Sequence, residues 1–145
     1  MRNSNSKIVL FQCVVFALSI WSCSKVEPKD NILDVAGIKE QDARVFYEQM
    51  KNAVLSGKKE TVAGFVHFPI GANIGGKHQA INNSKEFMNH YDEIINSQIK
   101  DILMKTKFED LKPNFRGLFV GDGQIIFGGV GSMKQYVVLI TSFNN

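Results

Sequence analysis

Hydrophobic positions along the chain follow a helical period first and a strand period later. In residues 41–55, Val45, Phe46, Met50 and Val54 recur at helical spacing, and Gly57 follows just after the last turn. This spacing predicts an amphipathic helix that ends near Gly57. Residues 59–66 predict a shorter helix, which must end before Pro69 because the residue preceding a proline avoids the α region.

The middle of the chain carries a strand signal and then a second helical signal. Residues 70–74 predict a strand, and residues 75–77 predict a turn. Asn83 or Ser84 is expected to cap a third helix, since Glu86 follows Asn83 at the spacing of a capping box. The apolar positions of this helix continue to Leu103, with a bend expected near residues 96–97.

Beyond residue 118 the apolar positions become dense and the turn residues frequent. Residues 118–120 and 124–130 predict a hairpin around the turn at residues 121–123. Residues 131–134 predict a second turn, and residues 135–143 predict a last strand that is apolar on both faces. Helices followed by a meander of strands predict an α+β fold with an antiparallel sheet.

Residues 1–22 have the pattern of a secretory signal peptide. Arg2 and Lys7 are followed by an apolar run over residues 8–21. A membrane-spanning helix needs roughly 20 apolar residues to cross a hydrocarbon core of about 30 Å, so this run is short for a span. Its length, charged flank and position are typical of a signal that is cleaved.

The end of this run resembles the lipobox of bacterial lipoproteins. Ile20 lies three residues before Cys23 and the small Ser22 lies directly before it, while Trp21 stands where a small or aliphatic residue is usual. The resemblance implies cleavage before Cys23 and lipidation of Cys23. The chain would then lie in the bacterial cell envelope, anchored to the membrane on the periplasmic or outer-surface side. Two alternatives stay open, an uncleaved signal anchor and ordinary cleavage after Ser19.

Cleavage before Cys23 changes the composition of the remaining chain. The chain has two cysteines, and Cys13 would leave with the signal, so no free thiol would remain for nucleophilic catalysis or metal binding. Loss of Arg2 and Lys7 reduces the 17 basic residues to 15 against 14 acidic ones, and the net charge from +3 to +1. Because no block of basic residues remains, we expect no nucleic-acid partner.

The rest of the chain divides into a tether and one domain. Residues 23–37 are polar and contain Pro28, which predicts a tether that begins at the lipidated cysteine. Residues 38–145 are enough to bury one core without disulfides.

This domain resembles the nuclear transport factor 2-like, or cystatin-like, superfamily. The resemblance rests on residues 46–57, residues 62–69, Asn83, Ser84, Phe87, Tyr91, Asp92, residues 121–123, Ile125 and Phe127. It implies N-terminal helices packed in the concave face of a curved antiparallel sheet, as a cone with a pocket. Domains of this superfamily often form a homodimer through the outer sheet face, so the resemblance makes a homodimer one candidate assembly. It does not imply a reaction, because this fold supports enzymes, carriers and binding modules alike.

The histidines are the main candidates for catalysis. His67, His78 and His90 are 11 and 12 residues apart, which is not the spacing of a local metal site, so no metal is expected. His67 is flanked by apolar residues, and enzymes of the resembled superfamily use a His or Asp in the cone as general base. The alternative function is therefore a small cofactor-free lyase or isomerase that uses His67, with Tyr91 or Tyr47 as its hydrogen-bonding partner.

Aromatic residues are the candidates for binding an apolar ligand. The residues expected at such a site in the cone are Tyr47, His67, Phe87, Tyr91 and Phe127. The competing interpretation is that most of the phenylalanines build the core. The glycine-rich stretches do not indicate a nucleotide, because residues 121–123 precede a strand rather than a helix and residues 128–132 lack a phosphate-loop lysine. We expect no cofactor.

Together these patterns favour a non-catalytic binding module over an enzyme. The hypothesis is an envelope lipoprotein that contacts the membrane through its N-terminal lipid. Its domain would bind either a small apolar molecule in the cone or an envelope or secreted protein on the exposed sheet face.

The lipobox resemblance predicts that a fatty acid supplied to the producing cell labels this chain at Cys23. The label should be lost in a Cys23→Ser variant, because the acceptor sulfur is gone. The measurement is metabolic labelling of the two chains expressed in parallel, with Cys13→Ser as control. A label that survives the Cys23→Ser substitution would exclude the lipid anchor.

Overall fold

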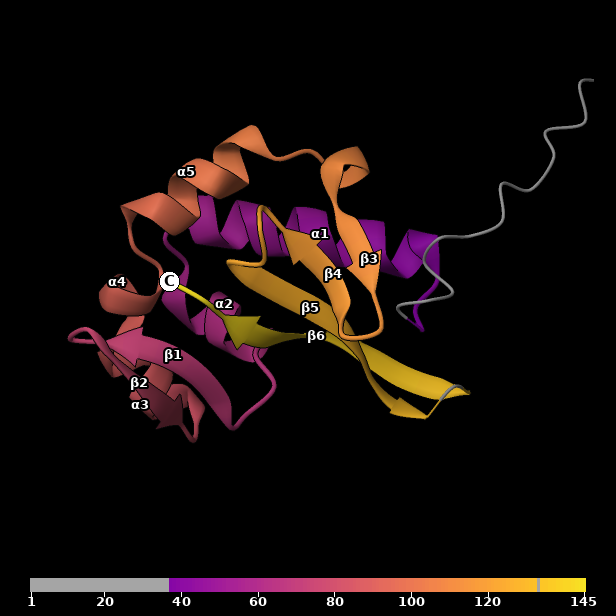
Figure 1. Cartoon of the computed structure of the whole chain (residues 1–145). Coiled ribbons are helices and arrows are strands. Elements are labelled where there is room, and N and C mark those ends of the chain that lie inside the picture. The colour runs from indigo at the N-terminus through magenta and orange to yellow at the C-terminus, as the bar shows by residue number, and fades with distance from the viewer. Residues whose placement is uncertain (1–36, 133) are drawn as a thin grey trace, which may run out of the picture.

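Helix α1 (Glu40–Leu55) lies along one face of an open antiparallel sheet (Figure 1). The computed structural model describes residues 37–132 and 134–145. The α+β class expected from the sequence is confirmed over these residues. Residues 1–36, which include Cys23, the signal segment and most of the tether, lie outside the described residues.

The sheet that α1 covers contains four strands in the order β3-β4-β5-β6. Their bounds are β3 (Lys112–Asn114), β4 (Gly117–Val120), β5 (Ile125–Ser132) and β6 (Gln135–Phe143). A separate hairpin is formed by β1 (Ile70–Ile74) and β2 (Lys77–Ile81). A parallel bridge between Val66 and Ile140 connects the segment after α2 to the outer side of β6.

The remaining helices are short and surround this framework. They are α2 (Lys59–Gly64), α3 (Ser84–Asn89), α4 (Tyr91–Ile94), α5 (Ser97–Lys105) and the 3-10 turn η2 (Phe108–Asp110). The helix expected to start at Asn83 divides into three pieces. Asn83 accepts a hydrogen bond from the backbone nitrogen of Glu86, and Asn96 accepts one from that of Ile99. Each asparagine therefore caps a helix start, and the second cap lies at the expected bend.

Two strands were not predicted from the sequence. Gly75 and Gly76 both have positive φ, and Ile74 pairs with Lys77, so these glycines form a two-residue hairpin turn and residue 77 already begins β2. Strand β2 is polar and mostly exposed, so it shows no apolar alternation. Strand β3 is three residues long and contains Pro113, which a sheet edge tolerates.

The core fills the space between α1, the sheet and the short helices. Phe46 and Tyr47 of α1 contact Phe127 of β5, with ring centroids 5.2 Å and 6.2 Å away. A second aromatic group joins Phe87 to Tyr91 at 5.9 Å and to Phe143 at 5.8 Å. Among the described residues, no helix is both long and apolar enough to cross a membrane.

Candidate functional site

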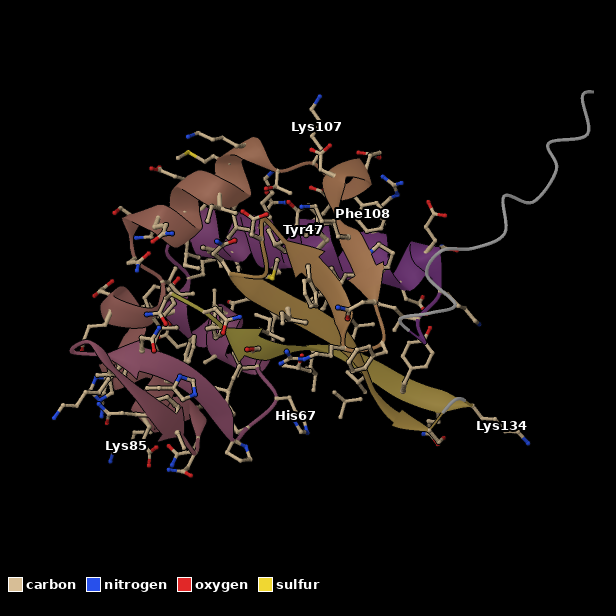
Figure 2. All side chains as sticks on the ribbon, viewed as in Figure 1. Tyr47, His67, Lys85, Lys107, Phe108 and Lys134 are labelled. Atoms are coloured by element: carbon tan, nitrogen blue, oxygen red, sulfur yellow. The ribbon has the colours of Figure 1, made fainter. Side chains whose placement is uncertain are left out.

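The residues expected to line a pocket lie in the packed core, with one exception. Tyr47, Phe87, Tyr91 and Phe127 are all buried and belong to the main hydrophobic cluster. His67 is exposed and lies in the connection between α2 and β1, where its backbone nitrogen donates to the carbonyl oxygen of Ile140 at 2.9 Å. In Figure 2, Tyr47 lies between α1 and the sheet, whereas His67 points away from the body of the domain.

The catalytic pair considered from the sequence is not assembled. The His67 ring makes no hydrogen bond to another described side chain, and the Tyr91 side chain is only 1% exposed. A general base must reach a substrate together with its partner group. The positions of His67 and Tyr91 therefore give the lyase or isomerase hypothesis no support. Groups of three or more potential metal ligands are also absent over residues 37–132 and 134–145.

The buried tyrosines differ in how their hydroxyls are satisfied. The Tyr47 hydroxyl donates to the carbonyl oxygen of Thr106 at 3.0 Å, and burial raises the pKa of Tyr47 to about 12. The Tyr91 hydroxyl is fully buried and has no hydrogen-bond partner among the described residues. Burial, followed by the charge of Asp92, raises the pKa of Tyr91 as well. Both phenols therefore stay neutral near neutral pH.

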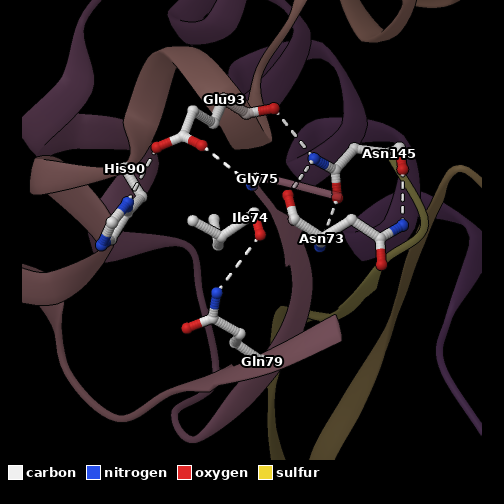
Figure 3. Close-up of polar contacts among 7 residues, drawn as sticks. All are labelled: Asn73, Ile74, Gly75, Gln79, His90, Glu93 and Asn145. Atoms are coloured by element: carbon white, nitrogen blue, oxygen red, sulfur yellow. Dashed lines mark hydrogen bonds and ion pairs between the residues drawn. The ribbon is translucent and has the colours of Figure 1, made fainter. Parts of the chain in front are cut away.

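A polar network lies near the C-terminal end of β6. The Asn145 side chain bonds to the backbone of Asn73 and to the carbonyl oxygen of Glu93, and the Glu93 carboxylate accepts from Gly75 and contacts the His90 ring at 2.9 Å (Figure 3). The contact with His90 and the bond from Gly75 lower the pKa of Glu93. Because these groups satisfy one another, the network joins β1, α4 and the end of the chain and acts as a structural connection.

An open groove lies between α1 and β6. Its volume is about 440 Å³. The residues that line it are Gln41, Asp42, Val45, Phe46, Gln49, Tyr136, Val137 and Val138. Gln41, Val45 and Gln49 are four residues apart and form one stripe along α1, which the helical period places on the same side. The size falls within the range of about 300–1,000 Å³ that is usual for ligand sites.

The lining of the groove combines apolar and polar side chains. Val45 is 51% exposed although it belongs to the apolar pattern of α1, and the next residue, Phe46, is buried. Gln41 and Gln49 add amide side chains to the lining. At one end, the Tyr136 hydroxyl donates to Asp42 at 2.6 Å and accepts from the backbone nitrogen of Lys39 at 3.0 Å. The groove therefore combines an apolar centre with a fixed polar end.

The edge of β6 beside this groove has no strand partner among residues 37–132 and 134–145. The backbone nitrogen of Ile140 donates to Phe65 and its carbonyl oxygen accepts from His67, so both polar groups of Ile140 point away from β5. Strand geometry repeats every two residues, which turns the same groups of Val138 and Tyr136 toward that edge. Within the described part of the chain, no other segment bonds to the backbone of these two residues. Val137, on the opposite face, is 62% exposed.

Sequence reasoning did not identify this site. The lining comes from two elements about 90 residues apart, and nothing in either pattern indicates that they meet. One signal was present. Val45 lies beside Phe46 at the margin of the apolar stripe, so that stripe is wider than one helix face needs.

Removal of the unpartnered hydroxyl should not harm the fold. We expect Tyr91→Phe to leave the free energy of unfolding unchanged or raise it by up to about 1 kcal/mol, because an unsatisfied buried polar group is unfavourable. Tyr47→Phe should lower it by about 1 kcal/mol, because a hydrogen bond is lost. Urea unfolding measures both. A destabilised Tyr91→Phe variant would mean that this hydroxyl has a partner.

The polar end of the groove predicts a pH effect. The hydrogen bond to the Asp42 carboxylate raises the pKa of Tyr136 above its usual value of 10.0. The pKa of Tyr136 is therefore higher in the folded than in the unfolded chain. The hydrogen bond to Asp42 stabilises the fold fully below the unfolded-state pKa of Tyr136, and this contribution is lost as pH rises through the folded-state pKa. Asp42→Asn should bring the pKa of Tyr136 down. Ring-carbon NMR titration measures it, with Tyr47 as internal reference. An unchanged Tyr136 pKa in this variant would contradict the assigned contact.

The chain has no match among the known protein family models, the curated proteins or the solved structures. The groove and the strand edge beside it are therefore the features of the molecule that indicate a function.

Proposed function

We propose that this chain is a lipid-anchored, non-catalytic binding module of the bacterial cell envelope that captures an extended polypeptide segment at the groove between α1 and β6. The observation that carries the proposal is the open groove around Val45, directly beside a strand edge that has no backbone partner among the described residues. Proteins that recognise extended peptides commonly add the peptide as a strand to such an edge, and side-chain pockets supply specificity.

The geometry favours a polypeptide over a small apolar molecule. The aromatic residues that would line an internal pocket are buried against one another, so they contribute to the core. The groove is open along its length, since Val45 is half exposed, and an open groove encloses a small molecule poorly. An extended segment would instead gain backbone hydrogen bonds from Tyr136 and Val138 and would bury Val45 with every second side chain.

The proposed anchor and fold fit this role. A lipid on Cys23 would hold the domain at the membrane through residues 24–36, where it can meet envelope or secreted proteins. The order of helices and strands, with α1 lying over the sheet, supports the cone of the nuclear transport factor 2-like superfamily as the finer fold assignment.

The proposal predicts the outcome of a peptide selection. Random displayed peptides of about 12 residues, selected on the purified full chain, should converge on apolar residues at alternate positions. Val45→Asp should weaken binding of a selected peptide about tenfold or more, because it places a charge in the apolar centre of the groove. Met104→Asp is the matched control, because Met104 is 57% exposed on α5 away from the groove. Isothermal titration calorimetry gives the affinities.

The same peptides test the strand pairing. Two peptides are compared, one N-methylated at the even positions and one at the odd positions. Only one of the two should lose binding, because only every second backbone amide of an added strand faces β6.

Equal loss of affinity in Val45→Asp and Met104→Asp would place binding outside the groove. A dimer that dissociates in Val45→Asp would make a second copy of the chain the occupant, and peptide capture would then be wrong.

A further inference from the structure

The described part of the chain begins at this same groove. Ile38 is only 3% exposed and packs closely against Gly129 of β5. A Cβ atom added to Gly129 would lie 2.9 Å from the Cγ2 atom of Ile38. The carbonyl oxygen of Gly37 would be 3.3 Å from that Cβ position. The next residue, Lys39, donates its backbone nitrogen to the Tyr136 hydroxyl. The described chain therefore begins over Gly129 of β5 and beside Tyr136 of β6, at the end of the groove that Asp42 and Tyr136 line.

The segment before Gly37 has the chemistry that the groove accepts. Residues 24–31 are mostly polar, with Val26 and Pro28 as exceptions, and the next stretch reads Ile32, Leu33, Asp34, Val35 and Ala36. Leu33 and Val35 are two residues apart, so they lie on one face of an extended strand, and Ile32 and Asp34 lie on the other. This stretch therefore presents apolar residues at alternate positions, as expected of the proposed partner.

The distances allow this segment to fold back onto the groove. Five residues of extended chain span roughly 17 Å, which covers Ile32 to Gly37. The α1 wall from Gln41 to Gln49 is about 12 Å long at 1.5 Å per residue. Gly37 has a φ of +67°, a conformation that permits a sharp change of direction just before α1.

We propose that residues 32–36 dock in the groove as an added strand on the free edge of β6, with Leu33 and Val35 against Val45. This inference rests on the proposed function, because the groove is taken as the binding surface, and it names the resting occupant that a partner must displace. Residue 36 is only two residues before Ile38, the first buried residue of the domain. A segment on so short a linker acts at an effective concentration near the millimolar range, so a weak intrinsic contact suffices to occupy the groove.

Displacement would also change how far the domain reaches from the membrane. Residues 24–36 can span roughly 45 Å when extended, whereas residues 24–31 span roughly 27 Å. Docking of residues 32–36 would hold the domain close to the lipid, and a bound partner would release it. Occupancy of the groove and reach of the tether are thus coupled.

Disulfide trapping tests the docking directly. The full chain with both native cysteines replaced, Cys13→Ser and Cys23→Ser, is given Val35→Cys and Val45→Cys and is oxidised mildly in detergent. Adding Leu33→Asp should slow disulfide formation about tenfold, because docking no longer raises the local concentration of the two thiols. Ile32→Asp is the matched control, one residue away on the opposite face of the strand, and should leave the rate unchanged. Equal rates in all three chains, or equal slowing by both aspartates, would overturn the inference.

A second arm separates this inference from the proposed function. In the chain without the engineered thiols at positions 35 and 45, Leu33→Asp should tighten binding of a selected peptide about tenfold, and Ile32→Asp should not. If Leu33→Asp alone slows disulfide formation but no peptide is selected, the docking of residues 32–36 is confirmed and the capture of a partner is wrong. If peptides bind through Val45 while Leu33→Asp changes neither trapping nor affinity, the groove stands and the docking of the tether is wrong.

Discussion

The contact between helix α1 and strand β5 through aromatic rings determines the rest of the arrangement. Phe46 and Tyr47, adjacent on α1, both contact Phe127, and all three rings are buried. Neighbouring residues on a helix point about 100° apart, so two contacts from adjacent positions fix its rotation as well as its distance from the sheet. With the rotation fixed, the stripe that carries Val45 must run along β6, and the groove follows from this placement.

The sheet itself explains why that groove has an open side. Strand β4 pairs with only Ile125–Phe127 of β5, while β5 and β6 continue together to the pair of Ser132 and Gln135. The far half of this hairpin therefore extends beyond its neighbours (Figure 1). The segment at Phe65 and His67 bonds to β6 at Ile140 and goes no further along it. Strand β4 lies on the other side of β5, so the segment at Phe65 and His67 is the neighbour of β6 on the groove side. Because that segment bonds only to Ile140, the edge at Tyr136 and Val138 has no backbone partner among the described residues.

Local signals in the sequence predicted much of this fold, and long-range contacts account for the rest. Helix α1 and strand β6 were predicted almost to the residue, because a dense run of apolar residues ends at turn residues beside each of them. A strict two-residue period would place Ile140 and Phe143 on opposite faces of β6, yet both are buried in the same core. The register shift near Phe127 gives β6 an extra residue, which breaks the two-residue period. The groove could not be predicted, since its walls meet only through the packing of Phe46 and Tyr47.

An unpaired strand edge beside apolar side chains needs protection, because it can pair with any exposed strand and lead to aggregation. Proteins commonly protect such edges with charges, prolines or a covering segment. Here Val137 and Val45 are exposed on either side of the edge, and the edge residues Tyr136 and Val138 carry no charge. A covering segment from the chain's own tether would protect the edge intramolecularly, and a partner would have to bind more tightly than that segment. The same contact would then limit aggregation and select against weak, unspecific partners.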